Sequence, residues 1–369
     1  MKVSFLAATI AIVLASVEAR PSGNRPPHQP KGGRKYNGGK VAIFGDYGWK
    51  GWNVPTAAEC AGLPAVGNCD PGDIASYPQA VAAQERTAKF FGQVCQEHKC
   101  NEVVTTGDNF YNVGLENYNH FKVGFIDMYT DKSLQIPWNP SIGNHDIVAN
   151  TSVQLELNAH KYDSRWYMPS RWYAHDVTVN DVKYHFTVLD SSPFINSYRT
   201  NPASPYYSQE LINTMNATML QEQIDFLDKS SSESDADWKF VVLHHPILST
   251  THNYTGAKDM GGLFQIVEKH KLTVINGHDH VLSHQQGNNT DFFTVGAGSL
   301  TAAGDGNYGV YEPYIKYVAA NATYADNGLA LLSGTKEELV VEYYAYLKGA
   351  KNPSYTAIVK QNRHYNITI

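Results

Sequence analysis

The sequence has little charge, few cysteines and, after its first 20 residues, no long apolar run. Only 17% of its 369 residues are charged, and 35 acidic residues against 29 basic ones give a formal net charge of −6. This balance argues against a general nucleic-acid binder, which needs a positive surface to displace phosphate counterions. Without a later apolar run of membrane length, we expect no membrane span. Hydrophobic residues make up 42%, enough for a packed core and too much for a disordered chain.

The charge is unevenly distributed along the chain. Residues 20–40 carry six basic side chains and no acidic one, and residues 1–19 are neutral overall, so residues 41–369 carry −12. The first 19 residues are typical of a secretory signal peptide, because Lys2 precedes a short apolar run and Val17-Glu18-Ala19 offers small residues for cleavage. We predict a signal peptide at residues 1–19, a basic, Pro- and Gly-rich flexible arm at residues 20–40, and a single domain at residues 41–369.

Cysteines and glycosylation motifs, like the predicted signal peptide, indicate the secretory pathway. The four cysteines lie within 41 residues, and an even count in an oxidising compartment favours two disulfides. Of the three possible pairings, the most local joins Cys60 to Cys69 and Cys95 to Cys100; a zinc site is disfavoured because no CxxC pair occurs. Six sequons predict glycosylation, at Asn150, Asn216, Asn253, Asn288, Asn321 and Asn366. We therefore expect a protein that is secreted or held in the lumen of an acidic secretory-pathway compartment.

Several segments share one design, in which a short apolar run is followed by glycine or a polar side chain. These runs lie at residues 40–44, 102–106, 138–142, 239–243 and 272–276. Helical patterns between them lie at residues 80–98, 218–230 and 260–270. Alternation of buried strands and helices predicts a largely parallel core, while residues 172–179 with 182–189, and residues 329–347, predict antiparallel pairs. We expect an α/β fold of two packed mixed β-sheets flanked by helices, in four layers.

Polar side chains with metal-binding potential follow these runs directly. They are Asp46, Asp108, Tyr111, Asn144, His244, His278 and His280. Because ligand sites gather beyond the carboxyl ends of parallel strands, we expect these residues to converge at one rim. Seven ligands are too many for a tetrahedral zinc site but suit two ions about 3.5–4 Å apart. Asp46 and Tyr111 are hard donors that favour Fe(III), amide and imidazole donors suit Fe(II), Zn or Mn, and Asp108 is the natural bridge.

These residues lie in five ordered blocks. The blocks are Gly45-Asp46-Tyr47-Gly48, Gly107-Asp108-Asn109-Phe110-Tyr111, Gly143-Asn144-His145-Asp146, residues 241–244 and Gly277-His278-Asp279-His280. Together they resemble the signature blocks of the purple acid phosphatases, in particular the small, tartrate-resistant type within the metallophosphoesterases. The resemblance covers roughly residues 41–295. Tyr111 is the discriminating residue, because other binuclear phosphoesterases usually place a His in the first block, where this chain has Asp46-Tyr47-Gly48.

The resemblance implies a four-layer metallophosphoesterase sandwich, a ligand assignment and a reaction. The implied ligands are Asp46, Tyr111 and His280 for Fe(III), Asn144, His244 and His278 for the divalent ion, and Asp108 for both. It implies a secreted acid phosphatase in which metal-activated hydroxide attacks a phosphate monoester. His145, helped by His252, would protonate the leaving alkoxide, which requires imidazolium and fits an acidic pH. The expected substrates are small phosphate esters, with phosphoproteins as an open alternative.

The chain departs from the family pattern at several positions near the expected cleft. Trp49 stands where the small enzymes usually have glycine, and His245 stands where tyrosine is usual. Residues 50–77 form a longer stretch than expected and include Cys60 and Cys69. Two other functions therefore stay open: a phosphodiesterase or nucleotidase on the same scaffold, and a secreted glycoprotein without catalysis. The pattern does not set the oligomeric state.

Overall fold

The computed structural model describes residues 33–62, 67–148, 151–156, 162–207, 217–250, 256–302, 309–321 and 324–363. The predicted signal peptide, residues 1–19, lies outside these residues. So do His252 and four of the sequon asparagines, Asn150, Asn216, Asn253 and Asn366. Among the described helices, none combines the length and the apolar character that crossing a membrane requires.

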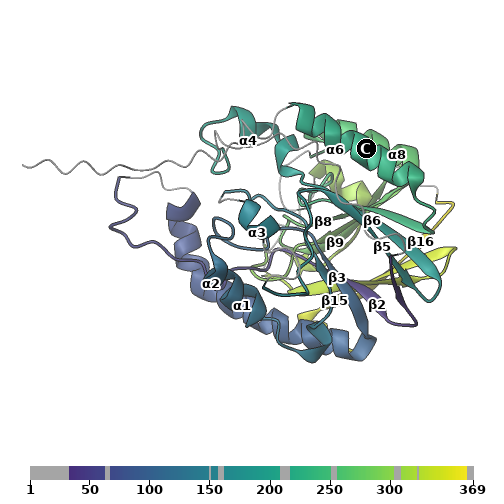
Figure 1. Cartoon of the computed structure of the whole chain (residues 1–369), viewed down its shortest axis with the longest axis horizontal. Helices are drawn as coiled ribbons and strands as arrows, with labels where there is room; N and C mark the ends of the chain where they lie inside the picture. Colours follow the sequence, from purple (N-terminus) through teal and green to yellow (C-terminus); the bar gives the residue numbers. More distant parts are fainter. Residues whose placement is uncertain are drawn as a thin grey trace, which may run out of the picture.

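Two mixed β-sheets pack against each other between layers of helices (Figure 1). In spatial order, the sheet of eight strands holds β1 (Arg34–Tyr36), β5 (Tyr173–Val179), β6 (Val182–Val188), β7 (Trp238–Val242), β8 (Thr273–Asn276), β10 (Thr290–Val295), β9 (Leu282–Gly287) and β11 (Ile315–Val318). The sheet of six strands holds β16 (Tyr355–Lys360), β15 (Glu338–Ala345), β14 (Gly328–Gly334), β2 (Lys40–Phe44), β3 (Cys100–Thr105) and β4 (Trp138–Asn139). A short pair, β12 (Ala320–Asn321) and β13 (Tyr324–Ala325), stands apart. The predicted fold class is confirmed.

Helices cover the outer face of each sheet (Figure 1). The α-helices are α1 (Pro71–His98), α2 (Tyr118–Phe121), α3 (Ser152–Glu156), α4 (Asn196–Thr200), α6 (Ala217–Glu233), α7 (Gly256–Asp259) and α8 (Gly261–His270). Short helical turns are η1 (Gly67–Cys69), η2 (Lys122–Ile126), η3 (Lys132–Leu134), η4 (Ser192–Phe194), η5 (Gly309–Tyr314) and η6 (Tyr346–Lys348). Helix α1 lies over the sheet of six strands, while α6 and α8 lie over the sheet of eight.

Strands at the centre of the sheets, such as β2, are buried on both faces because helices cover one side and the other sheet covers the other. In β2, Val41 and Ile43 belong to the core between the sheets, whereas Ala42 and Phe44 belong to the core under α1. This alternation is the two-residue period of a strand, and here both sides meet apolar neighbours. The continuous apolar runs in the sequence therefore follow from the four-layer arrangement.

Helix α1 begins earlier than its apolar pattern predicts. Asp70 is its N-cap, and the Asp70 side chain accepts the backbone N–H groups of Gly72 and Asp73. Pro71 occupies the first helical turn, where a missing N–H costs little. The capping residues, rather than the apolar stripe that starts at Ala80, set the true start.

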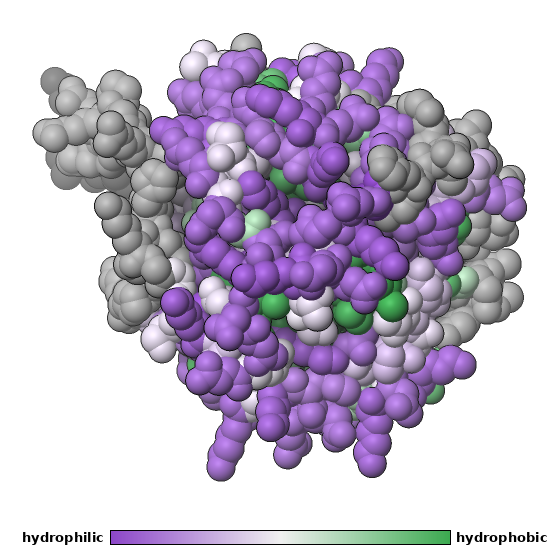
Figure 2. Space-filling model, turned by 90° about the vertical axis from the view of Figure 1, so that its right-hand side faces the viewer, coloured by the Kyte–Doolittle hydropathy of each residue, from purple (hydrophilic) through white to green (hydrophobic). Residues whose placement is uncertain are grey.

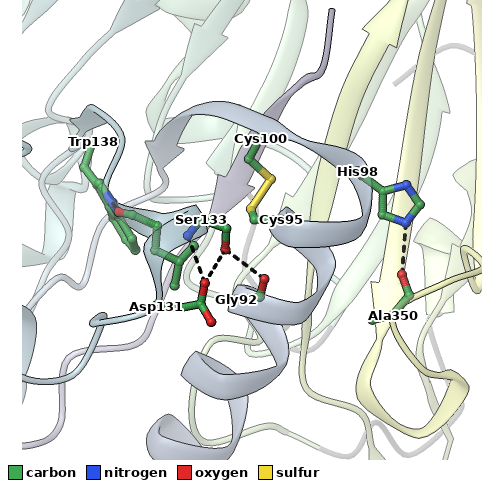
Figure 3. The surroundings of a disulfide bond; sticks show 9 residues. Gly92, Cys95, His98, Cys100, Asp131, Ser133, Trp138 and Ala350 are labelled. Carbon is green, nitrogen blue, oxygen red and sulfur yellow. Dashed lines mark hydrogen bonds between the residues drawn. A yellow bond between two sulfur atoms is a disulfide. The ribbon is translucent and has the colours of Figure 1, made fainter.

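The two disulfides have the most local of the three possible pairings. Cys60 is joined to Cys69 in the segment before α1, and Cys95 is joined to Cys100 across the end of that helix. Figure 3 shows the second bond, which ties α1 to the first residue of β3. Beside it, the Ser133 hydroxyl donates to the carbonyl oxygen of Gly92 at 2.8 Å. The helix is thus held to both the sheet and η3.

The end of the predicted flexible arm is part of the fold. Strand β1 pairs in parallel with β5, so the prediction that residues up to Lys40 form a flexible arm is wrong for Arg34–Tyr36. The physical reason is a buried charge: Arg34 Nη1 donates to Glu102 Oε2 at 3.0 Å, and Glu102 is fully buried. His175 Nε2 lies 3.1 Å from the other Glu102 oxygen. A buried carboxylate needs such partners, which draws the chain onto the sheet.

The face of the molecule drawn in Figure 2 is mostly hydrophilic. Hydrophobic residues show there as small, separate spots. Over the described surface as a whole, single apolar side chains such as Leu347 and Ile358 are exposed. Scattered apolar residues of this kind are normal on soluble proteins and imply no partner.

Candidate metal centre

The predicted ligands follow strand ends in both sheets. In the sheet of six strands, β2 leads to Asp46, β3 leads to Asp108 and Tyr111, and β4 leads to Asn144; in the sheet of eight, β7 leads to His244 and β8 leads to His278 and His280. Strands β2, β3 and β4 are mutually parallel, as are β7 and β8. Their carboxyl ends therefore deliver all seven side chains to one rim.

The backbone turns sharply at these strand ends. Asp46, Asp108 and His278 have φ angles of 58°, 49° and 68°, a region that non-glycine residues seldom adopt. The neighbouring glycines allow close approach between blocks. A Cβ atom at Gly143 would lie 2.1 Å from Asp108 Oδ1, and one at Gly277 would lie 2.4 Å from Asp46 Oδ2. Glycine at both positions is thus required by contact between blocks, not by local flexibility.

One group of ligand atoms gathers around the hydroxyl of Tyr111. Its Oη lies 3.0 Å from Asp108 Oδ2, 3.4 Å from Asp46 Oδ1 and 3.1 Å from His280 Nε2. His280 Nε2 is also 3.5 Å from Asp46 Oδ1. Asp46, Tyr111 and Asp108 are buried, while His280 is partly exposed.

A second group gathers around the amide oxygen of Asn144. Asn144 Oδ1 lies 2.7 Å from His244 Nε2 and 2.8 Å from His278 Nδ1, and these two nitrogens are 3.3 Å apart. His244 Nε2 is also 3.3 Å from Asp108 Oδ2. Asp108 therefore contacts both groups, as a shared ligand must.

The electrostatics of the buried carboxylates call for positive charge. Burial raises the pKa of Asp46, with only partial compensation from His280. Burial also raises the pKa of Asp108, but the nearby His244 and His145 outweigh it and hold this pKa far below its usual range. For His244, burial lowers the pKa, but the Asp108 and Asp46 carboxylates outweigh that effect and raise it to about 9. Converging lone pairs on oxygen and imidazole nitrogen are a donor set that fits metal ions.

His245 is a further imidazole beside this donor set. Two clusters bring ligand-type atoms within 4.8 Å of one another: His244, His245 and His278, and Asp46, Asp108 and His280. Both ring nitrogens of His245 are already engaged, Nδ1 with Ser191 Oγ at 2.9 Å and Nε2 with Tyr198 Oη at 3.1 Å. Its contacts therefore make it a support for the neighbouring histidines rather than a ligand.

A cavity of about 200 Å³ opens onto the ligand groups. It is lined by Asp108, Asn144, His145, Tyr206, His278, His280 and Ala302. In His145, Nδ1 lies 2.6 Å from the carbonyl oxygen of Asn112, and Nε2 lies 3.2 Å from Tyr206 Oη. The predicted catalytic residue His145 thus faces the cavity, while His252 lies outside the described residues.

The sequence patterns missed three residues that organise the site. Asp146 is buried and accepts the backbone N–H groups of Gly143, Asn109 and Phe110, which binds the second block to the third. Its place at the end of the third block, beside predicted site residues, could have indicated this role. Tyr206 gave no signal, because it is one of 24 tyrosines and lies far from every block.

Asp279 is the third of these residues, and it lies inside the fifth block. Its carboxylate accepts the Ser249 hydroxyl and the Thr250 backbone N–H, both at 2.8 Å. This fully buried carboxylate thereby holds residues 249–250 against the fifth block. Its position between two predicted ligands could have indicated a supporting role.

Comparison with known proteins identifies the family. Residues 39–282 match the calcineurin-like phosphoesterase family. Purple acid phosphatase 4 of Arabidopsis thaliana is 30% identical over 266 residues, which is 71% of this chain and 75% of that protein. Tartrate-resistant acid phosphatase type 5 of Oryctolagus cuniculus is 27% identical over 289 residues, covering 76% of this chain and 85% of that protein.

Among solved structures, the fold is similar to that of GAP50, described as the anchor in the inner membrane complex of Plasmodium. The TM-score is 0.64 at 18% identity, over 89% of this chain and 90% of that one. This likeness concerns the fold alone. The family match and the relatives of similar sequence show that the chain belongs to the calcineurin-like phosphoesterases and, within them, to the purple acid phosphatases.

Proposed function

We propose that this protein is an acid phosphatase that hydrolyses phosphate monoesters at a pair of metal ions, Fe(III) and a divalent ion. The observation that carries the proposal is the convergence of Tyr111 Oη with Asp46, Asp108 and His280 at 3.0–3.4 Å, beside the second group around Asn144. A phenol among carboxylates is a hard, anionic donor set that favours a trivalent ion. The relatives named as acid phosphatases support the same activity.

The two groups of side chains would hold different ions. Asp46, Tyr111 and His280 would hold Fe(III); Asn144, His244 and His278 would hold Fe(II), Zn or Mn; and Asp108 would serve both. When bound, the ions supply positive charge, orient the phosphate and make a water molecule acidic enough to act as nucleophile. The combined charge of Fe(III) and a divalent ion exceeds that of the three anionic donors, Asp46, Asp108 and the Tyr111 phenolate. The occupied site would therefore remain positive and attract a phosphate dianion despite the chain's net charge of −6.

His145 would move a proton at the leaving oxygen. Its Nδ1 lies 2.6 Å from the Asn112 carbonyl oxygen, which can only accept, so Nδ1 carries a proton. Nε2 is the nitrogen bonded to Tyr206 Oη beside the cavity. In the imidazolium form Nε2 also carries a proton and can donate it to the leaving alkoxide, which favours acidic conditions.

A leaving-group comparison tests the proposal. We expect the purified protein to hydrolyse an aryl phosphate monoester faster than the matching diester, with its activity highest below neutral pH. His145→Ala should slow an alkyl phosphate about 100-fold and an activated nitrophenyl phosphate far less, because only the poor leaving group needs the proton. Faster diester hydrolysis would favour the phosphodiesterase or nucleotidase. A protein without metal or turnover would favour the non-catalytic glycoprotein.

We also propose that the protein is secreted or lumenal, is glycosylated, and forms one domain. The two disulfides support the oxidising compartment. The core between the sheets runs from Val41 to Val359, which supports one domain. Of the sequons, Asn288 lies in the turn between β9 and β10, where its amide donates to Glu268 Oε1 at 3.0 Å, and Asn321 ends β12. Glycosidase treatment of secreted protein, followed by mass measurement, tests the glycosylation.

A further inference from the structure

Trp49 lies face to face with Tyr111. The ring centroids are 4.4 Å apart and the planes differ by 4°. The imidazole of His145 lies 4.4 Å from the Tyr111 ring centroid with its plane inclined by 48°. Trp49 is 2% exposed and Tyr111 is fully buried. The phenol ring is thus held in a stack by the indole while its hydroxyl points toward Asp46, Asp108 and His280.

An aromatic wall, formed by Trp49, Trp52 and Tyr77, stands behind this stack. Trp52 meets Trp49 edge-on at 6.1 Å, and Tyr77 meets Trp52 edge-on at 5.5 Å. Trp52 Nε1 donates to Asn68 Oδ1 at 2.7 Å, beside the Cys60–Cys69 disulfide. Trp52 and Tyr77, which lie on either side of the Cys60–Cys69 disulfide within residues 50–77, therefore contribute directly to the packing behind Tyr111.

The indole of Trp49 contributes its face and not its N–H group. Within the described part of the chain, Trp49 Nε1 has no hydrogen-bond partner although it is buried. A buried tryptophan normally finds such a partner, and leaving the group unpaired is unfavourable. Trp52, the neighbouring tryptophan, does have one. The position of Trp49 is therefore explained by its contact with the Tyr111 ring.

We propose that Trp49 is a positioning residue that fixes the Tyr111 ring and tunes its phenolate as a ligand of iron. The inference rests on the proposed assignment of Tyr111 to Fe(III). Visible absorption by an iron–phenolate pair moves electron density from the ring toward the metal, and this leaves the ring electron-poor. The electron-rich face of an indole stabilises an electron-poor ring, so stacking shifts the absorption to longer wavelength. The indole also excludes water from the phenolate.

The test compares visible spectra of the purified holoenzyme carrying Trp49→Leu or Trp49→Phe. In Trp49→Leu the absorption maximum should move to shorter wavelength and a chelator should remove iron about tenfold faster, because the ligand is less well oriented. Trp49→Phe keeps a ring face against Tyr111 and should retain most of the wild-type maximum. Trp52→Leu is the matched control: it removes an equally buried indole from the same wall without touching Tyr111, and its maximum should stay at the wild-type wavelength.

The outcomes separate this inference from the proposed function. A wild-type holoenzyme that contains iron but lacks the visible absorption would overturn the assignment of Tyr111, and the role of Trp49 with it. A wild-type protein with the absorption and a Trp49→Leu variant with the same maximum and iron retention would overturn the role of Trp49 alone. If Trp49→Leu does not fold, a shift of the absorption maximum in Trp52→Leu that is larger than the shift in Trp49→Phe would likewise refute a specific role. Near-UV circular dichroism of the metal-free proteins gives a further readout of the stack.

Discussion

The two groups of ligand atoms are supported in different ways. Behind Tyr111 the support is aromatic, with Trp49 stacked on the ring and the rest of the wall behind it. Behind His244 the support is polar: Ser191 Oγ accepts the backbone N–H groups of His244 and His245 at 3.2 and 3.0 Å. Ser191 also contacts the His245 ring at 2.9 Å. One group is thus oriented by packing and the other by hydrogen bonds.

This difference shows that two kinds of contact can fix ligands within one centre. Aromatic packing restricts a ring and excludes water, and it leaves the ligand's oxygen free for a metal. Hydrogen bonds to histidines and their backbone fix the direction of a nitrogen lone pair. Variants on the aromatic side should therefore change the visible absorption and the rate at which a chelator removes iron, and variants on the polar side should change the affinity for the divalent ion.

Asp108→Asn should break both sides at once and have the largest effect. Asp108 contacts Tyr111 Oη at 3.0 Å and His244 Nε2 at 3.3 Å, so its carboxylate lies against a donor atom of each group. We expect the monoesterase activity to fall about 1,000-fold, corresponding to about 4 kcal/mol of lost transition-state stabilisation. Steady-state kinetics and metal analysis check this, with circular dichroism as the folding control. Retention of two metal ions and near-normal turnover would refute the shared role.

His120→Leu should make the protein more resistant to unfolding at acidic pH, in a second aromatic region around Phe110. His120 packs edge-on against Phe110 at 5.4 Å, and within the described residues neither ring nitrogen has a hydrogen-bond partner; Glu116 Oε2 lies 3.9 Å from Nδ1. Burial lowers the pKa of His120 from 6.5 to about 4. Between pH 6.5 and about pH 4 the unfolded chain binds a proton that the folded chain does not. The free energy of unfolding therefore decreases as the pH is lowered through this range.

The expected gain for His120→Leu is therefore confined to acidic pH. The free energy of unfolding of the variant minus that of wild type should be about 2 kcal/mol more favourable at pH 5 than at pH 7.5, because the variant lacks this proton-linked loss. Urea unfolding at the two pH values measures the change. Parallel stability–pH curves for the two proteins would show that His120 does not titrate as its burial predicts.

Ser191→Ala should weaken the polar side without affecting the colour. Loss of the hydroxyl removes the acceptor for two backbone N–H groups and frees His245 Nδ1, so the neighbouring His244 is less well oriented. We expect the affinity for the divalent ion to fall about tenfold, with the visible absorption maximum unchanged. Ser192→Ala is the matched control, because Ser192 is buried beside it and its Oγ has no hydrogen-bond partner in the described chain. Equal effects of the two variants would contradict the role of Ser191.

Tyr206→Phe should give the smallest effect, because Tyr206 only links the two sides. Its hydroxyl bonds His145, and its ring packs 5.0 Å from that of Tyr198, the partner of His245. Loss of one hydrogen bond costs about 1 kcal/mol, so turnover of an alkyl phosphate should fall about fivefold. Turnover of a nitrophenyl phosphate should change less, and the adjacent Tyr207→Phe should match wild type. An equal loss with both substrates would place Tyr206 in binding instead of proton transfer.

The sequence predicted the strand ends and the polar side chains that follow them because both are local features. A short apolar run followed by glycine and a polar residue marks a buried strand and its turn, as at Phe44-Gly45-Asp46. The ligand set came from the ordered blocks and from the family resemblance, and the structure brings these side chains together. Four apolar runs in the sequence thus located strands β2, β3, β7 and β8 to within two residues at either end.

The supports could not be predicted, because they depend on contacts between distant segments. Tyr206 meets His145 across 61 positions, and Ser191 meets His245 across 54. No local pattern marks such pairs. The ordered end of the arm was missed for the same reason, since Arg34 is placed by Glu102, 68 positions away. Trp49 was visible in the sequence only as a departure from the family, and the stack on Tyr111 gives that departure a physical meaning.

The metal content and visible spectrum of the purified protein, measured beside those of Tyr111→Phe, most directly test whether Tyr111 binds iron in a centre of two metal ions. We expect two metal ions per chain, at least one of them iron, and a visible absorption that Tyr111→Phe abolishes. A protein that binds no metal under metal-replete conditions, or an iron-loaded protein whose spectrum Tyr111→Phe leaves unchanged, would contradict this expectation.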